Sequence, residues 1–306
     1  MSFWTDKKVF ITGHKGLIGT PLVRLLEEKG AEVHGYDVAD SSDENLDNTE
    51  LLRHCFTTVQ PDVIIHLAAI SGVEQARSLQ NNTLEVNVKG TWNVLNTALG
   101  CGSYPVVVAS SNHVYGPQLT LPVDEKAPLN QLDTYSVSKI CADYITRAYS
   151  HNYGLPTVVV RNTNCFGPAD PHHDHLIPGT ILSILRGETP ILQSHGTTKK
   201  GYLYVDDVAE AYMAAAQFLI ENKESTVFNV GARPVSAIEV VNQISTLMGY
   251  GGGVTIHEED NDQTDEDLDW SNFYARTRWH PRHTLTEALE KTIDWFTANH
   301  KVEAIV

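Results

Sequence analysis

Cysteine is scarce in this sequence, and long apolar runs are absent from it. The four cysteines lie far apart, without the CxxC spacing of a zinc site, so they are expected to be reduced thiols. No stretch approaches the roughly 18–20 apolar residues that cross a bilayer. The first residues, MSFWTDKKVF, lack the apolar segment of a signal peptide. These absences argue against a disulfide-stabilised secreted domain and a membrane protein, and they favour a cytoplasmic protein.

Basic residues are also few. The 306 residues include 22 Lys and Arg against 38 Asp and Glu, for a net charge of −16. A chain of this charge repels polyanions, so we expect no nucleic-acid partner, although a few local cations can still hold a small anion. Its length and its hydrophobic content of 42% are those of a globular protein with a large core.

Short apolar runs alternate with helical patterns over the first half of the chain. The runs are rich in Val and Ile, as in strands that are buried on both faces of a parallel sheet. The expected strands are residues 8–12, 31–37, 62–68, 105–111 and 156–162. The expected helices are residues 17–29, 49–59, 83–99 and 134–152. This alternation predicts an α/β fold with a doubly wound parallel sheet of the Rossmann type.

A glycine-rich loop joins the first expected strand to the first helix. Its sequence, ITGHKGLIGT, has the spacing G-x-x-G-x-x-G at Gly13, Gly16 and Gly19. Such glycines permit a tight turn and let the backbone approach a pyrophosphate at a helix N-terminus. Asp37 follows about 20 residues later, where a carboxylate accepts the hydroxyls of an adenosine ribose and repels a 2′-phosphate. The pattern predicts an NAD site rather than an NADP site; the alternative is an ordinary turn and a surface aspartate.

The regular alternation ends near residue 165. Further helices are expected near residues 178–187, 236–248 and 284–296, the last with a capping box of Thr284 and Glu287. Residues 202–217 and 227–231 are expected to return to the sheet, and residues 258–269 to form a solvated acidic loop. We therefore expect a NAD-binding Rossmann domain of residues 1–165, to which 202–231 return. A smaller substrate-binding lid of residues 166–201 and 232–306 would cover the carboxyl edge of the sheet.

Two polar side chains, Tyr135 and Lys139, lie four residues apart on an expected helix and therefore share one of its faces. A nearby ammonium group favours phenolate and lowers the pKa of a tyrosine, which makes Tyr135 a plausible general base. Ser111, at the end of an expected strand, can hydrogen-bond the same substrate oxygen. Such a pair also occurs by chance on structural helices, but here it follows a dinucleotide loop and four of the expected strands.

These motifs together resemble a known family. The matching elements, in chain order, are TGHKGLIG, HLAA, NVKGT, SSNHVYG, YSVSK, RNTNCFGP, LIP, YLYVDDV, FNVG and a C-terminal W-x-P. They cover nearly the whole chain. The sequence is similar to extended short-chain dehydrogenases/reductases of the nucleotide-sugar epimerase/dehydratase family. The stretch from YSVSKICADYI to LIPGTILSILRGETPIL most resembles CDP-glucose 4,6-dehydratases.

The resemblance implies a role for each matching residue. The residues implied to hold NAD are Gly13, Gly16, Leu17, Ile18, Gly19, Asp37, Asp47, Ala68, Ala69, Asn87, Tyr135 and Lys139. The residues implied to be catalytic are Ser111, Tyr135 and Lys139. The residues expected to contact a nucleoside-diphosphate sugar are Ser111, Asn112, Asn164, Leu176, Lys200 and Arg276. Lys200-Gly201 replaces the family's usual Arg-Asp, which keeps the charge without the bidentate fork of arginine.

Residues 112 and 113 depart from the pattern of the dehydratases. Those enzymes carry an acid, usually Asp, at the first position to protonate the departing C6 hydroxyl, and Glu or Lys at the second to remove the C5 proton. Asn112 cannot protonate a leaving group, whereas His113 can act as a catalytic base or only fill the pocket wall. The departure favours 4-epimerisation through a 4-keto intermediate over 4,6-dehydration.

Two other functions remain open at this point. The string SSNH also resembles uronate dehydrogenases, although those chains are shorter and lack the nucleotide-binding lid. A non-catalytic dinucleotide-sensing protein on the same fold is the alternative of another class, but such proteins typically lack the tyrosine–lysine pair.

The sequence also bears on metal binding and on association with a second copy of the chain. The segment PHHDHLIP, residues 171–178, is rich in histidine, but the resemblance implies a substrate loop, so no metal is expected. The helices expected at 83–99 and 134–152 carry apolar residues beyond one face. In the family these helices pair across a two-fold axis, which implies a homodimer.

Overall fold

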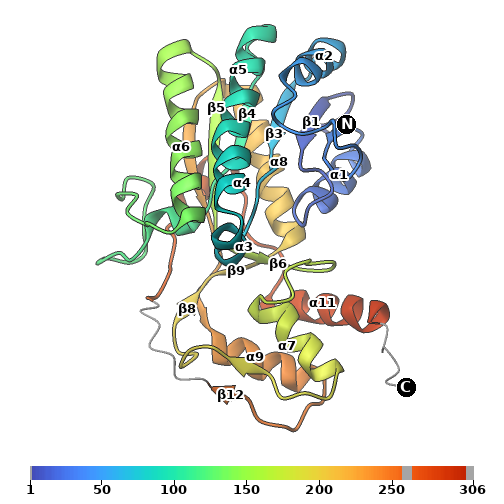
Figure 1. Cartoon of the computed structure of the whole chain (residues 1–306), viewed down its shortest axis with the longest axis vertical. Helices are drawn as coiled ribbons and strands as arrows, with labels where there is room; N and C mark the ends of the chain where they lie inside the picture. The colour runs from blue at the N-terminus through green and yellow to red at the C-terminus, as the bar shows by residue number, and fades with distance from the viewer. Residues whose placement is uncertain (1, 257–263, 301–306) are drawn as a thin grey trace.

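A six-stranded parallel sheet forms the centre of the protein, as the computed structural model in Figure 1 shows for residues 2–256 and 264–300. The strand order is β10-β5-β4-β3-β1-β2, and every pairing is parallel. The strands are β1 (Lys8–Thr12), β2 (Glu32–Tyr36), β3 (Val63–His66), β4 (Val106–Ala109), β5 (Thr157–Asn162) and β10 (Thr226–Val230). The predicted fold class is confirmed, because the sheet is doubly wound and parallel.

Helices cover both faces of this sheet because successive strand residues point to opposite sides. In β4, Val107 packs in the core that also holds residues of α1 and α8, whereas Val106 and Val108 pack with residues of α2 and α5. These helices are α1 (Gly19–Glu28), α8 (Val205–Asn222), α2 (Thr49–Val59) and α5 (Thr91–Gly102). Next to α5 lies α6 (Thr134–Tyr153), the long helix that carries Tyr135 and Lys139.

The helix predicted at 83–99 is longer and is interrupted. It follows α3 (Val73–Ser78) and consists of α4 (Gln80–Leu84), a π-helical segment η1 (Glu85–Gly90) and then α5. Within η1, the side chain of Asn87 bonds the backbone of Ile70, and a Cβ atom on Gly90 would lie 2.5 Å from a methyl carbon of Leu46. The local distortion therefore coincides with close tertiary contacts that hydrophobic periodicity does not reveal.

The second half of the chain differs from the prediction in two places. Residues 202–217 do not enter the large sheet: β9 (Tyr202–Tyr204) pairs only with β6 (Asn164–Phe166), and α8 begins directly afterwards. Residues 271–279, expected in the lid, pack instead on the main body. There α10 (Ser271–Thr277) contacts β10 and α8. Phe273 and Trp279 join the core that also holds residues of α1 and α8. The expected return of β10 to the sheet is correct.

Three helices form a smaller layer below the sheet in Figure 1, with a core of their own. They are α7 (Leu176–Leu185), α9 (Ala237–Leu247) and α11 (Leu285–Asn299), of which α9 and α11 begin with capping boxes. Short strands accompany them: β7 (Ile191–Leu192), β8 (Lys199–Lys200), β11 (Val235–Ser236) and β12 (Thr255–Ile256). Residues 258–263 of the expected acidic loop lie outside the described residues. Among the described residues, no helix combines the length and the apolar character that crossing a bilayer requires.

Candidate active site

A cavity of about 1250 Å³ lies between the sheet and the small helical layer. Residues that directly follow β1, β2, β3, β4 and β5 line it, so it occupies the carboxyl edge of the sheet. This edge is where open α/β sheets bind ligands, at the point where the strand order reverses beside β1. Typical small-ligand sites measure about 300–1,000 Å³, so this cavity has room for a dinucleotide and a second ligand.

The glycine loop after β1 has the close packing that a dinucleotide loop needs. Gly13 adopts a φ of +74°, and a Cβ atom there would lie 2.6 Å from the backbone nitrogen of Ala68. A Cβ atom on Gly19 would overlap the carbonyl oxygen of Gly13. Side chains are therefore excluded from the turn, and the N-terminus of α1 stays open toward the cavity. This cradle fits the pyrophosphate of NAD.

Most of the predicted cofactor residues line the cavity. They are Gly13, Gly16, Leu17, Ile18, Gly19, Asp37, Ala68, Ala69, Tyr135 and Lys139. The Asp37 carboxylate accepts hydrogen bonds from the backbone nitrogens of Lys15, at 3.1 Å, and Ala39, at 2.9 Å. It is thus fixed at the end of β2, where the ribose hydroxyls of an adenosine would lie.

Asn87, which the resemblance implies to hold NAD, does not line the cavity. Its Oδ1 accepts a hydrogen bond from the Ile70 nitrogen at 2.8 Å, and its Nδ2 donates to the Ile70 oxygen at 2.9 Å. Nδ2 also lies 2.9 Å from the hydroxyl of Ser138 on α6. Asn87 therefore ties the loop after β3 to the helix that carries Tyr135, without touching the cavity itself.

Two predicted binding residues lie elsewhere. Asp47 is not among the cavity-lining residues and forms an ion pair of 3.1 Å with Lys89. Arg276 belongs to α10 on the main body, where it pairs with Glu224 and lies 4.4 Å from the ring of Phe218. The expected substrate contact of Arg276 is therefore a wrong prediction for this structure, because α10 packs against β10 and α8 instead of the lid.

Ser111, Tyr135 and Lys139 all line the cavity, and Ser111 and Tyr135 are hydrogen-bonded to each other. Lys139 is only 6% exposed, and its Nζ donates a hydrogen bond of 3.0 Å to the Ala109 carbonyl at the end of β4. Burial lowers the pKa of Lys139 to about 8. Burial also raises the pKa of Tyr135 to about 12, although a hydrogen bond with Ser111 opposes that shift. The sequence predicted a lowered pKa for Tyr135; the structure gives a raised pKa, and burial of the phenol is the largest cause.

Asn112 and His113 form the 3₁₀ turn η2 (Asn112–Tyr115), whose start Ser111 caps by accepting a hydrogen bond from the His113 nitrogen at 3.2 Å. The His113 ring lies edge-on to the Tyr135 ring, with 6.1 Å between centroids. Its Nε2 lies 3.5 Å from Oδ1 of Asn164. His113 thus packs against the ring of Tyr135, and both residues line the cavity.

The opposite wall of the cavity carries the remaining predicted substrate residues, Asn164, Leu176 and Lys200. Lys200 forms an ion pair of 3.0 Å with Glu266, and the other oxygen of that carboxylate accepts a hydrogen bond from the amide of Asn112. Sequence reasoning missed Glu266, because it lies among several acids of an expected solvated loop. Only the tertiary fold brings it to residue 112.

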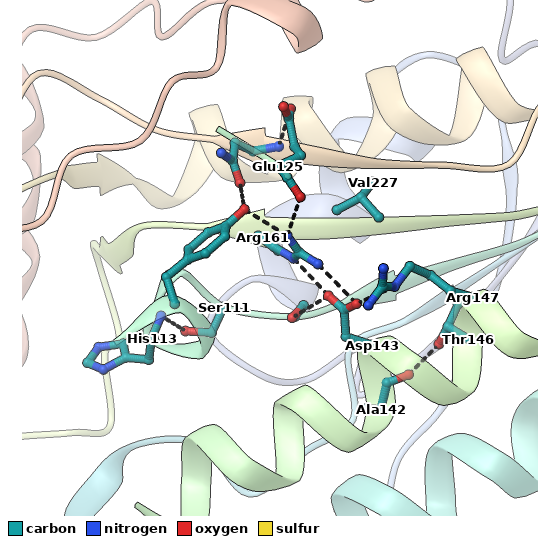
Figure 2. Close-up of polar contacts among 12 residues, drawn as sticks. Ser111, His113, Glu125, Ala142, Asp143, Thr146, Arg147, Arg161 and Val227 are labelled. Atoms are coloured by element: carbon teal, nitrogen blue, oxygen red, sulfur yellow. Dashed lines mark hydrogen bonds and ion pairs between the residues drawn. The ribbon is translucent and has the colours of Figure 1, made fainter. Parts of the chain in front are cut away.

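A buried ion pair supports the floor of the site (Figure 2). Arg161 on β5 and Asp143 on α6 are both almost fully buried, and two nitrogens of Arg161 donate to the carboxylate at 2.8 and 3.1 Å. Arg161 also donates to the hydroxyl of Tyr115, at 2.8 Å, and to the carbonyl of Glu125, at 3.1 Å. The network joins β5, α6 and the segment after Ser111, and thereby holds the elements that carry the candidate catalytic groups.

Comparisons with known proteins agree with this geometry. The chain is 28% identical to a probable dTDP-glucose 4,6-dehydratase of Sinorhizobium fredii, over 95% of this chain and 93% of that protein. It is 28% identical to the CDP-glucose 4,6-dehydratase of Salmonella typhimurium, over 97% and 92% of the two chains. The structure of MoeE5 in complex with UDP-glucose and NAD is 26% identical, with a TM-score of 0.85 over 95% of this chain and 99% of that one.

A UDP-glucose 4-epimerase structure from Thermotoga maritima shares the fold, with a TM-score of 0.86 at 22% identity over 95% and 99% of the two chains. The model of one family, described as the NAD dependent epimerase/dehydratase family, matches residues 9–231. This match covers most of the chain, including the glycine loop, Ser111, Tyr135 and Lys139. The chain belongs to the NAD dependent epimerase/dehydratase family.

Proposed function

We propose that this protein is a nucleotide-sugar 4-epimerase that oxidises C4 of a nucleoside-diphosphate sugar to a ketone and reduces it again from the other face. The observation that carries this proposal is the grouping of Ser111, Tyr135 and Lys139 beside a dinucleotide cradle, together with an amide at residue 112. The relatives and structures named above include both 4,6-dehydratases and a 4-epimerase, so the choice between these reactions depends on the residues of this chain.

Three side chains divide the work of the oxidation. Tyr135, as phenolate, removes the proton of the C4 hydroxyl, and Ser111 holds the same oxygen by a hydrogen bond. Bound NAD would supply the hydride acceptor for the oxidation of C4 and the hydride for its reduction. The Lys139 ammonium group lies on the same helical face as Tyr135 and would favour its phenolate form electrostatically during the reaction.

The amide of Asn112 favours epimerisation over dehydration. A dehydratase must protonate the C6 hydroxyl as it leaves, and an amide carries no proton that it can release at neutral pH. In this structure the Asn112 nitrogen donates instead to Glu266. The 4-keto sugar then keeps its C6 hydroxyl, and the return of hydride to the opposite face of C4 completes the reaction.

A 4,6-dehydration is the second candidate, and two observations favour it. The first is that relatives aligned over nearly the whole chain carry the name 4,6-dehydratase. The second is the contact between the Glu266 carboxylate and Asn112, which brings an acidic group next to the position of the missing aspartate. In that reaction His113 would remove the C5 proton, and Glu266 or a water molecule would protonate the departing hydroxyl.

The substrate is proposed to lie along the wall formed by Asn164, Leu176 and Lys200. The Lys200 side chain is 22% exposed, so its ammonium group can exchange the Glu266 carboxylate for a diphosphate oxygen. The size of the cavity supports a substrate that carries a nucleotide, because a free uronate would leave most of it empty. The protein is further proposed to act in the cytoplasm as a homodimer.

Turnover of sugar nucleotides tests this function. The protein is incubated with NAD and a panel of UDP-, CDP- and dTDP-linked sugars, with product identified by NMR and NADH followed by its absorbance. We expect one sugar nucleotide to change its C4 configuration without net NADH formation, since the hydride returns to the sugar. Oxidation of a free uronate with one NADH formed per sugar, and no conversion of any sugar nucleotide, would overturn the proposal in favour of a uronate dehydrogenase.

A further inference from the structure

The loop between β6 and α7 brings three potential metal ligands together on the cavity wall. One ligand atom each from His172, Asp174 and His175 lies within 4.8 Å of the other two, and all three residues line the cavity. From this cluster we propose that the protein binds a divalent transition-metal ion of the zinc type. The histidines were seen in the sequence, but only the fold shows that His173, between them, points away and packs against Phe296.

Both histidines of the cluster have partners that fix the orientation of their rings. Nε2 of His172 lies 3.0 Å from the hydroxyl of Ser71, in the loop after β3, which leaves Nδ1 for a metal ion. Nδ1 of His175 lies 3.7 Å from Oδ2 of Asp170, which leaves Nε2. The two rings stack with centroids 4.6 Å apart. Metal-binding histidines characteristically turn their second nitrogen to a carboxylate, hydroxyl or carbonyl group of this kind.

Asp170 supplies an independent observation. It is 2% exposed, and its Oδ2 atom is buried without a hydrogen-bond partner. Its other oxygen accepts a hydrogen bond of 3.0 Å from the His172 nitrogen, which holds the carboxylate beside the cluster. A buried carboxylate oxygen without a partner is costly. Coordination of a cation by His175 would strengthen its ring N–H as a donor and draw it to this oxygen.

The ligand set indicates the class of ion. Two imidazoles and one carboxylate suit Zn²⁺ and related ions, whereas Mg²⁺ and Ca²⁺ prefer oxygen ligands alone. Metal–ligand bonds of about 2.0–2.2 Å place ligand atoms at most about 4 Å apart, so the cluster closes slightly on binding. Asp174 and His175 are exposed and can make this adjustment. Three protein ligands leave a coordination position open toward the cavity.

The open position is suited to an anionic oxygen, and this use of the site rests on the proposed function. Among the described residues that line the cavity there is no arginine, and Lys200 is already paired with Glu266. A bound cation would add positive charge to this wall and could take a phosphate oxygen of the sugar nucleotide. Because the hydroxyl of Ser71 contacts His172, the bound cation would also connect the loop after β3 to the loop between β6 and α7.

Cobalt(II) provides a direct test, because its visible absorption reports tetrahedral coordination by histidine. The full chain is treated with a chelator, passed over a desalting column and titrated with Co²⁺ in the absence of nucleotides. We expect one equivalent to bind with tetrahedral bands. The double variant His172→Ala/His175→Ala should bind at least about 100-fold more weakly, whereas His173→Gln, the matched control, should bind like the parent protein. Thermal stabilisation by NAD verifies that each variant is folded.

Absence of the bands in the parent protein, or equal bands in the double variant, would overturn the metal site. Addition of UDP to the cobalt-loaded protein then tests the use of the open position, and a changed spectrum is expected. Bands that UDP leaves unaltered would keep the site but contradict its role in binding a diphosphate. Because the titration uses no sugar nucleotide, its outcome is independent of whether the protein is an epimerase.

Discussion

The two sides of the cavity are built differently. One side, here called the cavity floor, is lined by Ser111, Tyr135 and Lys139 and includes the buried pair of Asp143 and Arg161 that supports them; these residues lie on or next to β4, β5 and α6. The other side, here called the lid wall, is lined by residues of loops and short strands, His172, Asp174, His175 and Lys200, and includes Glu266, which is paired with Lys200. Floor residues are largely buried and tied to regular elements, whereas the wall residues retain substantial exposure. Under the proposed function, the floor would carry the oxidation at C4 and the wall would select the substrate.

The charges on the two sides also differ. On the floor, the buried Arg161 donates two hydrogen bonds to the Asp143 carboxylate, and Lys139 is desolvated with a lowered pKa. On the lid wall, Lys200 and Glu266 form a partly exposed pair that water or an anion can replace. Substitutions on the floor should therefore affect catalysis and stability strongly, and those on the wall should mainly affect binding.

The largest effect is expected at Tyr135. Replacement of Tyr135 by Phe removes the acid–base group and should reduce the turnover number by about 10²–10⁴-fold. Tyr144→Phe, on the exposed side of the same helix, is the matched control and should retain full activity. Initial rates with the active sugar nucleotide measure both variants. A Tyr135→Phe variant with more than a tenth of the parental rate would show that the floor does not carry the chemistry as described.

The next effect concerns stability. Arg161→Met removes the buried partner of the Asp143 carboxylate, which then keeps only the partly exposed guanidinium of Arg147, at 2.9 Å. The free energy of unfolding should fall by up to about 3–5 kcal/mol. Lys200→Met, the same change in charge on the lid wall, should lower it by about 1 kcal/mol or less, because its ion pair is partly exposed. Urea denaturation of both variants measures the difference. Equal losses would remove the energetic distinction between the two sides.

A smaller, pH-dependent effect is expected from Lys139. Its pKa is about 8 in the folded protein, against a usual value of 10.5. Between these two pH values the unfolded chain binds more protons than the folded protein, so the contribution of Lys139 to folding stability rises with pH. Below about pH 8 the ammonium group is charged in both states, and the full cost of burying its charge destabilises the folded state. The unfolding free energy of the parent protein minus that of Lys139→Met should therefore rise by on the order of 2 kcal/mol between about pH 8 and 10. A pH-independent difference would contradict the lowered pKa.

The smallest effect on the cavity is expected from substitutions on the exposed surface of α5 and α6. Trp92 on α5 and Tyr144 on α6 are about half exposed, at 48% and 53%, as in a surface that meets a second copy. Trp92→Glu should convert the proposed homodimer into monomers of 33.8 kDa in light scattering while preserving NAD binding. A parent protein that is already monomeric at micromolar concentration would refute the dimer.

The floor could be predicted from sequence because its residues follow local patterns. The boundaries of β1 and α2 agree with the prediction to the residue, and the glycine loop, Ser111 and Tyr135 occupy strand ends and a helix face. Here hydrophobic periodicity and turn chemistry act over a few residues. The positions of Gly13 and Lys139 followed from the same patterns.

The lid wall could not be predicted in the same way because its contacts join distant segments. Glu266 meets Asn112 across 154 positions of the sequence, and Ser71 meets His172 across 101. Neither contact leaves a local pattern. The predicted substrate contact of Arg276 was wrong for a related reason. The packing of α10 on the main body depends on tertiary neighbours, since Phe273 is buried with β10. The raised pKa of Tyr135 likewise depends on burial, which its spacing to Lys139 does not show.

The most direct test of the proposed epimerisation is the mass of the product formed in deuterated water. An epimerase returns the hydride of C4 from the cofactor, so the product should have the mass of the substrate and carry no solvent deuterium at C5. Loss of the C6 hydroxyl requires removal of the C5 proton and its replacement from solvent. A product lighter by one water, with deuterium at C5, would contradict the role given to Asn112 and identify the protein as a 4,6-dehydratase.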